Sequence, residues 1–129
     1  MLHLPDFQAT RLAEAVEGLS PEALDQLPFG VIKLDPQGVV QVYNREESLR
    51  SGRGGMPAVG LQYFIDVAPC MDNGYFKGRI EKARAAGVLN ISFEFIGDFN
   101  DRNREISVRV QAAKDGGSWI FTKTPEATP

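Results

Sequence analysis

The chain contains one cysteine, Cys70, and one histidine, His3, and these two residues limit the chemistry that it could perform. A catalytic thiol needs a base beside it, and His3 lies near the N-terminus, far from Cys70 in sequence. A single cysteine excludes an internal disulfide, and one cysteine with one histidine makes a poor zinc site. Two interpretations of Cys70 stay open: a small buried hydrophobic residue, or the covalent anchor of a cofactor, which needs neither a base nor a metal.

Four polar residues precede Cys70 at short spacing: Tyr43, Glu47, Ser51 and Arg53. Taken alone, each has an ordinary interpretation. The tyrosine could be a half-buried packing residue, the glutamate part of an exposed helical face, and the arginine a solvated charge. The serine hydroxyl could bind backbone groups in a loop. Residue type alone therefore identifies no site.

The composition is that of a folded globular domain. Of the 129 residues, 43% are hydrophobic and 24% are charged, and the formal net charge is −3. This balance argues against nucleic acid as a partner, because phosphate binding requires a basic surface. No apolar run is long enough to span a bilayer, and the first residues lack the pattern of a signal peptide. We therefore expect a cytoplasmic protein without membrane insertion.

Local patterns predict helices at the N-terminus, then a hairpin and further short helices. Apolar residues at helical spacing predict a helix over 5–18, and Ser20-Pro21-Glu22 begins a short helix that ends at Leu27. Alternation and turn residues predict the elements that follow: strands at 29–34 and 39–44, short helical turns within 45–57, a brief helix over 59–67, and a longer helix over 76–86 with Gly87 as its left-handed cap.

The last third of the chain predicts three strands, at 89–95, 105–112 and 118–123. Hairpins at both ends of the core favour one five-stranded antiparallel sheet with short helices on one face and an N-terminal helical cap, an α+β fold. This layout resembles a PAS domain, in which sheet and helices enclose a ligand pocket. We expect a single domain composed of a cap, a PAS core with the pocket, and a tail, at 1–28, 29–124 and 125–129.

A longer set of residues resembles one family in both type and spacing. The segment Tyr63-Phe64-x-Asp66-Val67-Ala68-Pro69-Cys70 is similar to the chromophore-attachment segment of the photoactive yellow proteins. The same register continues on both sides, through Phe29-Gly30-x-Ile32-x-Leu34-Asp35, Gln41-x-Tyr43-Asn44, Glu47, Gly52-Arg53, Gly87-x-Leu89-Asn90, Phe93-Glu94 and Trp119-x-Phe121. Because the resemblance covers nearly the whole chain in one register, it outweighs the ordinary interpretations of the single residues.

The resemblance implies a cofactor, p-coumaric acid (4-hydroxycinnamic acid), bound as a thioester to Cys70. It implies that Tyr43 and Glu47 hydrogen-bond the buried phenolate of this group. By the same resemblance, Ser51 supports the tyrosine and Arg53 covers the pocket. The backbone and apolar walls would come from Phe64, Val67, Ala68 and Pro69.

The resemblance also implies a function, that of a blue-light photoreceptor. Light would isomerise the vinyl bond of the chromophore from trans to cis, and a proton would then move from Glu47 to the phenolate. Glu47 would be protonated in the dark, a form that burial and a neighbouring anion both favour. The bare carboxylate left behind is unstable in place, so the N-terminal cap would loosen to hydrate it and thereby signal.

Some positions depart from the family pattern, and other functions stay open. Asp101 and Gly97 stand where the family has a methionine and an aromatic residue, while Tyr63 replaces phenylalanine and Ser51 replaces threonine. The alternative function is a PAS-fold module that binds a small molecule or a partner, with Cys70 merely buried. We expect no enzyme, because the cofactor cycles without turning over a substrate. The expected partner is an unidentified downstream signalling protein, and the expected state is a monomer or weak homodimer.

Overall fold

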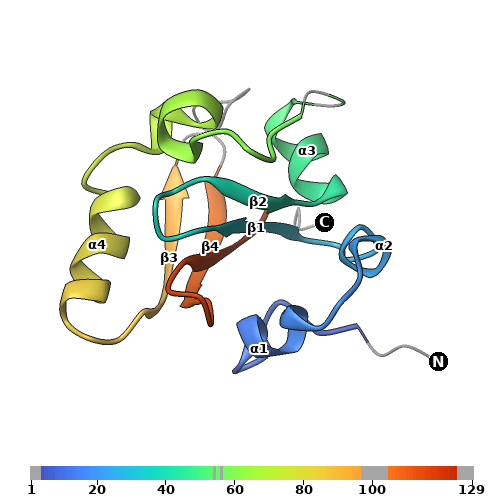
Figure 1. Cartoon of the computed structure of the whole chain (residues 1–129), viewed down its shortest axis with the longest axis horizontal. Coiled ribbons are helices and arrows are strands. Elements are labelled where there is room, and N and C mark those ends of the chain that lie inside the picture. The colour runs from blue at the N-terminus through green and yellow to red at the C-terminus, as the bar shows by residue number, and fades with distance from the viewer. Residues whose placement is uncertain (1–3, 54, 56, 97–104, 125–129) are drawn as a thin grey trace.

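One antiparallel sheet organises the molecule (Figure 1), as seen in a computed structural model that describes residues 4–53, 55, 57–96 and 105–124. The strands are β1 (Gly30–Leu34), β2 (Val40–Tyr43), β3 (Asn90–Ile96), β4 (Glu105–Ala112) and β5 (Ser118–Lys123). Their order in the sheet is β2-β1-β5-β4-β3, with all neighbours antiparallel. The last strand therefore joins the two hairpins at the centre of the sheet, and the predicted α+β sheet is confirmed.

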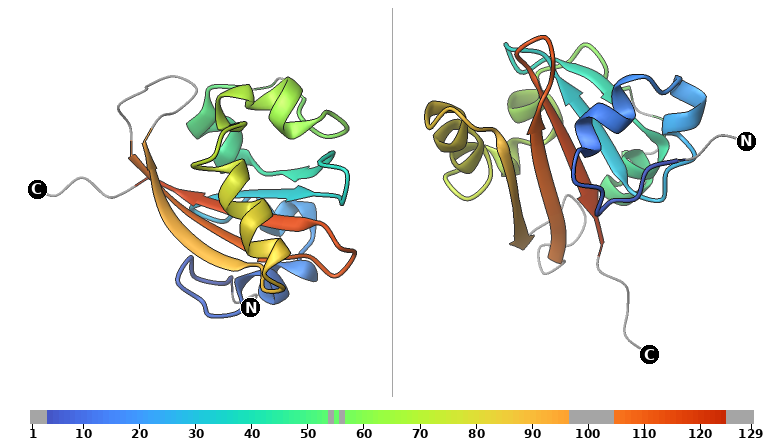
Figure 2. Two further views of the ribbon diagram at one scale, coloured as in Figure 1. Left: turned by 90° about the vertical axis from the view of Figure 1, so that its left-hand side faces the viewer. Right: turned by 90° about the horizontal axis from the view of Figure 1, so that it is seen from below.

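Short helices cover both faces of this sheet: α1 (Leu12–Glu17), α2 (Pro21–Leu24), α3 (Arg45–Ser51), α4 (Lys77–Ala85), a π-helical turn η1 (Tyr63–Val67) and a 3-10 turn η2 (Pro69–Met71). The right-hand view of Figure 2 shows α1 and α2 on one side of the sheet and α4 on the other. His3, Gly97, Asp101 and the expected tail lie outside the described residues.

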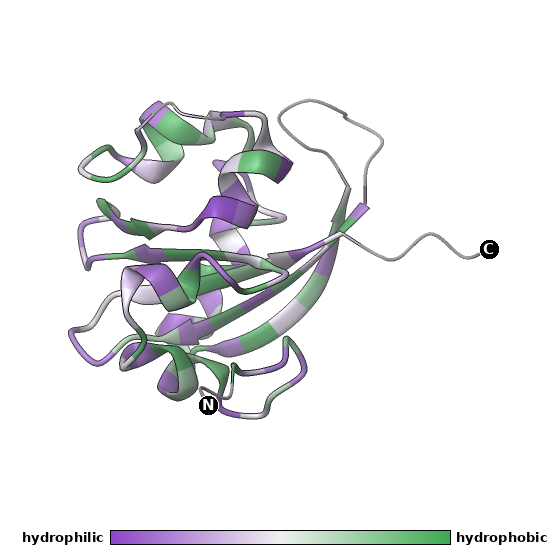
Figure 3. Cartoon of the chain, turned by 90° about the vertical axis from the view of Figure 1, so that its right-hand side faces the viewer, coloured by the Kyte–Doolittle hydropathy of each residue, from purple (hydrophilic) through white to green (hydrophobic). Residues whose placement is uncertain are grey.

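Alternation of side chains along the strands separates two hydrophobic cores. On β5, Ile120 belongs to the core beneath the helical middle of the chain. Its neighbours Trp119 and Phe121 face the other way, where Leu12 and Val16 of α1 pack against them. Figure 3 shows hydrophobic and hydrophilic residues alternating along the strands. The N-terminal segment thus covers the sheet face opposite to the helical middle.

The first helix is shorter than predicted, because α1 begins at Leu12 rather than at residue 5. The residues before it use their carbonyl groups to bind the sheet. The Arg109 guanidinium of β4 donates hydrogen bonds to the carbonyls of Phe7 and Ala9, at 2.5 and 2.7 Å. A helix over these residues would use the same carbonyls internally. Docking onto β4 therefore replaces the helical hydrogen bonds.

The helix α3 is more regular than the short turns predicted for this part of the chain. Asn44 caps its N-terminus, because the side-chain oxygen accepts a hydrogen bond from the backbone N–H of Glu47 at 3.2 Å. Gly52 ends the helix in the left-handed conformation, with φ of 81°. Glu47 follows Asn44 by three residues, which is the spacing of a capping box at the start of a helix. The prediction that placed Asn44 in a strand overlooked this signal.

The brief helix predicted over 59–67 is correct only in its last part. There η1 closes a π-helical turn, in which the backbone N–H of Ala68 donates to the carbonyl of Tyr63 at 2.7 Å. In a π-helix the hydrogen bond joins residues five positions apart, so one turn contains more than four residues. Val67 and Ala68 therefore lie on the same side of the turn as Tyr63. This common face is the one directed toward α3.

The 3-10 turn η2 was not predicted, and the other elements agree with the predictions apart from their ends. The helix α2 ends at Leu24 rather than Leu27, and the carbonyl of Leu24 accepts a hydrogen bond from the Asn44 amide at 2.8 Å. Gly87 follows α4 with φ of 91°, the left-handed conformation predicted for it. Among the described helices, none has the length and apolar character needed to cross a membrane.

Candidate functional site

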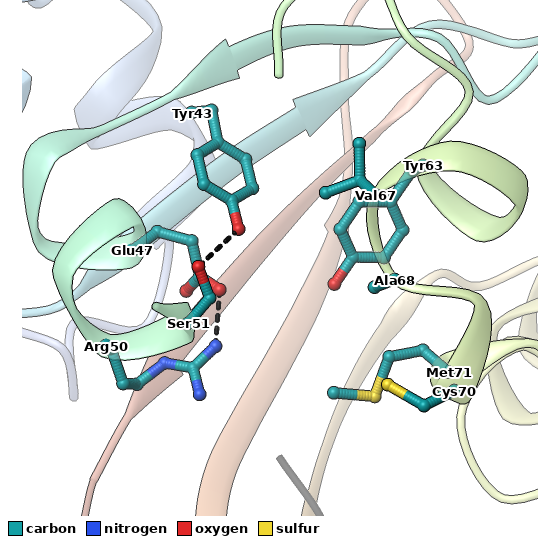
Figure 4. Close-up of a pocket in the computed structure, with 9 residues that line it drawn as sticks. All are labelled: Tyr43, Glu47, Arg50, Ser51, Tyr63, Val67, Ala68, Cys70 and Met71. Atoms are coloured by element: carbon teal, nitrogen blue, oxygen red, sulfur yellow. Dashed lines mark hydrogen bonds and ion pairs between the residues drawn. The ribbon is translucent and has the colours of Figure 1, made fainter. Parts of the chain in front are cut away.

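A narrow pocket lies between α3 and the two helical turns η1 and η2 (Figure 4). It is lined by polar residues of β2 and α3 on one side and by residues of the turns on the other: Tyr43, Glu47, Arg50, Ser51, Tyr63, Val67, Ala68, Cys70 and Met71. The cavity volume is about 10 Å³, enough for about one water molecule. Side chains therefore nearly fill the pocket.

Tyr43 ends β2 and directs its hydroxyl toward α3, where it hydrogen-bonds the Ser51 hydroxyl at 2.8 Å. Burial, assisted by the negative charge of Glu47, raises the pKa of Tyr43 from 10.0 to about 12. The phenol therefore stays protonated at neutral pH and can donate a hydrogen bond. The hydrogen bond to Ser51 holds the Tyr43 hydroxyl against α3.

Glu47 is the buried acid of the pocket, with 1% of its surface exposed. One carboxylate oxygen accepts a hydrogen bond from the Thr122 hydroxyl of β5, and the other pairs with the Arg50 guanidinium. Gly30 of β1 makes this possible, because a Cβ at that position would overlap both the Glu47 carboxylate and the Thr122 hydroxyl. The Phe29-Gly30 motif thus has a steric role beneath the pocket.

Arg50 is a charged residue of the pocket that the sequence analysis missed, together with Met71 in the lining and Thr122 beneath it. The Arg50 side chain is only 6% exposed, and it lies one helical turn after Glu47 on the same face of α3. A guanidinium beside a carboxyl group favours the ionised form of that group. Its effect on Glu47 is therefore opposite to the protonated form expected from the sequence. The capping box at Asn44 was the available signal, because a helix from Arg45 that turns Glu47 inward turns Arg50 inward too.

Tyr63 adds a second phenol to the pocket and is 2% exposed. Burial, and then the charge of Glu47, raise the pKa of Tyr63 well above 10.0, so this hydroxyl also stays protonated. Its ring packs edge to face on Phe64, with the centroids 4.9 Å apart. Phe64 is half-buried and packs on Phe76, but it does not line the pocket.

Cys70 lies in η2 and is exposed while it also lines the pocket. Figure 4 shows its side chain extending toward the α3 side of the pocket, beside that of Met71. The interpretation of Cys70 as a buried hydrophobic residue is therefore wrong, and so is that part of the alternative function. Pro69 is exposed and begins the turn that carries the thiol. Among the described residues, no group of His, Cys, Asp and Glu could hold a metal ion.

Arg53 follows α3 and is 9% exposed, yet it does not line the pocket. Its guanidinium donates a hydrogen bond to the carbonyl of Pro57 at 2.9 Å. Its positive charge still acts on Tyr43, where it opposes the rise of the pKa. Of the predicted site residues, the structure brings six to one pocket: Tyr43, Glu47, Ser51, Val67, Ala68 and Cys70. Arg53, Phe64 and Pro69 stand around it.

Comparison with known proteins finds relatives along most of the chain. It is 34% identical over 113 residues to the photoactive yellow protein of Rhodothalassium salexigens, which covers 87% of this chain and 90% of the relative. It is 32% identical over 123 residues to that of Halochromatium salexigens, covering 95% and 98%. The chain belongs to the photoactive yellow protein family. No profile of a known protein family matches it.

Solved structures agree with membership of the photoactive yellow protein family. The photoactive yellow protein domain of the sensor histidine kinase Ppr from Rhodospirillum centenum has a TM-score of 0.78 and 34% identity, covering 87% of this chain and 99% of that domain. A PAS domain of an HTR-like protein from Haloarcula marismortui has a TM-score of 0.57 at 12% identity, covering 81% and 88%, and shares the fold. The chain is a PAS-fold photoreceptor of the sensory signalling class.

Proposed function

We propose that this protein senses blue light with p-coumaric acid bound as a thioester to Cys70. One observation carries the proposal: an exposed thiol and a set of buried hydroxyl and carboxyl groups line opposite sides of one pocket. A thioester needs an accessible thiol, and a buried phenolate needs hydrogen-bond donors in place of water. Membership of the photoactive yellow protein family supports the same cofactor.

The chain's own residues fit such a group. When bound, p-coumarate supplies absorption of blue light and a double bond that light isomerises. Tyr43 serves as a permanent donor to the phenolate, because its pKa of about 12 keeps the hydroxyl protonated. Ser51 can then donate to the Tyr43 oxygen. Glu47 is the second donor, in its protonated form, and releases that proton after illumination.

The volume of the pocket is about 10 Å³, which is too small for an aromatic ring. The pocket therefore widens when the ring binds. Arg50 and Met71 are long side chains in the lining. Met71 can change rotamer at low cost, whereas Arg50 has to leave its buried ion pair with Glu47 to move. We assign the opening of the pocket to these two residues. Arg53 donates a hydrogen bond to the carbonyl of Pro57 and so fixes the segment after α3. Its positive charge acts on Tyr43 from there.

The signal passes from Glu47 to the N-terminal segment. Glu47 lies on α3, and the residue that caps this helix, Asn44, also donates a hydrogen bond to the carbonyl of Leu24 in α2. A change at Glu47 that strains the start of α3 therefore acts on the cap, which loosens. The relative that forms part of a sensor histidine kinase supports a signalling protein as the partner downstream.

The test is to incubate the ligand-free protein with an activated ester of p-coumaric acid and record its mass and absorption. We expect the mass to rise by one coumaroyl group and a visible band to appear, bleach in blue light and return in the dark. Cys70→Ala should stay unmodified and colourless, whereas Ile65→Ala, at an exposed residue outside the pocket lining, should still be modified. Covalent colour in Cys70→Ala, or a wild-type protein that stays unmodified, would contradict the proposal and favour a reversible binding module.

A further inference from the structure

The buried ion pair between Arg50 and Glu47 has no role in the function proposed so far. The two side chains are 6% and 2% exposed, and they lie within the pocket rather than on the surface. Removing two charges from water is costly, so such a pair is retained in a small core only with compensation. Here the Thr122 hydroxyl supplies a further hydrogen bond to the carboxylate.

Among the described residues, further ionisable groups from the neighbouring elements lie around this pair. They are Tyr43 of β2, Tyr63 of η1 and the Cys70 thiol of η2, with Thr122 of β5 contributing an uncharged hydroxyl. Arg53 after α3 lies outside the pocket lining, and its charge acts on Tyr43. The two phenols are neutral donors at physiological pH, because the pKa of Tyr43 is about 12 and that of Tyr63 is also raised. Arg50 is therefore the cation that lines this pocket among the described residues.

We propose that Arg50 sets the charge state of the pocket: it keeps Glu47 a carboxylate in the ligand-free protein, and it becomes the counterion of an anionic ring that enters. The first half concerns the polypeptide alone, and the second half rests on the proposed function.

The exchange balances in charge and protons. Two anions beside one guanidinium repel each other, so one of them takes up a proton. When Arg50 turns to the incoming phenolate, Glu47 loses this cation and gains one proton from the solvent. After illumination Glu47 gives that proton to the phenolate. The ring is then neutral, so Arg50 pairs with the Glu47 carboxylate again. The light state of this chain therefore holds a compensated carboxylate, and Arg50 limits how far the N-terminal cap loosens.

The first experiment needs no chromophore. Infrared spectra of the ligand-free protein are recorded at neutral pH for two pairs. The first pair is the wild-type protein and Glu47→Gln. The second pair is Arg50→Met and the double variant Arg50→Met/Glu47→Gln. We expect no loss of a protonated-carboxyl band in the wild-type background and a clear loss in the Arg50→Met background. Arg50→Lys, which keeps the charge, should behave as wild type. If Arg50→Met does not fold, Arg50→Gln keeps hydrogen-bond donors without the charge. A protonated Glu47 in the wild-type protein would overturn the inference.

The second experiment titrates the visible band of the coloured protein with acid. Without Arg50 the phenolate loses a nearby cation, so the midpoint in Arg50→Met should rise by about one to three pH units. Arg45→Met removes the same charge from an exposed position on the same helix and should leave the midpoint in place. Equal midpoints in the two variants would overturn the counterion role. A colourless wild-type protein would contradict the proposed function instead, and the infrared experiment would still decide the first half.

Discussion

Among the described residues, Glu47 contacts Thr122 on β5, across the backbone of Gly30, and Arg50 on its own helix. The close approach exists because Gly30 has no Cβ, so the carboxylate can lie directly over β1. The hydroxyl of Tyr43 is held in place by its hydrogen bond to Ser51. Burial, assisted by the charge of Glu47, keeps this hydroxyl protonated. Individual residues therefore determine both the shape and the charge of the pocket.

Gly30→Ala should destabilise the protein by about 2–3 kcal/mol, because the added methyl overlaps the Glu47 carboxylate and the Thr122 hydroxyl. Urea unfolding measures this change. The matched control is Gly18→Ala, where an added Cβ meets nothing within 4 Å, and its effect should stay within about 0.5 kcal/mol. Equal effects of the two substitutions would show that the carboxylate does not lie over β1.

The free energy of unfolding should fall as the pH rises from 10 to about 12. In this range the unfolded tyrosines lose their protons while Tyr43, with its pKa raised to about 12, keeps its own, so the native state binds more protons. Tyr63 acts in the same direction. Urea unfolding at several pH values should show a loss of up to about 2 kcal/mol from Tyr43, reduced in Tyr43→Phe. Tyr75→Phe, at a residue 73% exposed, should keep the wild-type decline.

At the scale of elements, α3 joins the pocket to the N-terminal segment. The Asn44 side chain accepts hydrogen bonds from the backbone of Val31 at 2.8 Å and of Glu47 at 3.2 Å. It donates to the carbonyls of Leu24 at 2.8 Å and Phe29 at 3.1 Å. One buried amide thus holds the start of α3, the start of β1 and the end of α2 together.

Asn44→Ala should cost about 2–4 kcal/mol, because it removes a helix cap and leaves several buried backbone groups without their partner. Hydrogen exchange should speed up in α2 and α3 together. Ser20→Ala, which removes a single capping bond of 3.2 Å at the start of α2, should cost about 1 kcal/mol and leave α3 protected. Exchange that rises in α3 alone after Asn44→Ala would disprove the coupling between the two helices.

At the scale of the whole molecule, polar contacts fasten the N-terminal segment to the sheet face opposite to the helical middle. Arg109 binds the carbonyls of Phe7 and Ala9, and the Trp119 indole donates to the Glu17 carboxylate at 2.9 Å. Beneath these contacts Phe7 packs edge to face on Phe29, with ring centroids 5.5 Å apart. The segment is therefore held by a few polar groups and by one small apolar core, and it can open while the sheet stays folded.

Arg109→Met keeps the apolar part of the side chain but loses the charged donors, so the N-terminal segment should open about ten to a hundred times more often. Chymotrypsin cleavage at Phe7, measured under native conditions, should accelerate by a similar factor. Arg79→Met removes an arginine from the exposed surface of α4 and should not change the rate. Equal cleavage rates in the Arg109 variant and the wild-type protein would exclude this anchoring role.

The sequence by itself determined the family, the PAS fold and the strand segments, because alternation, turn residues and motif spacing are local properties of the chain. It also identified Cys70, Tyr43 and Glu47, which the structure brings to one pocket. Only the tertiary structure decided what surrounds them. Thr122 meets Glu47 across 75 positions of sequence, and Arg50 turns inward because α3 packs on β1. The capping box at Asn44 can place Arg50 on the same helix face as Glu47, but it does not say what that face packs against. No local pattern records the contact with Thr122, because it depends on how the helix and the sheet pack against each other.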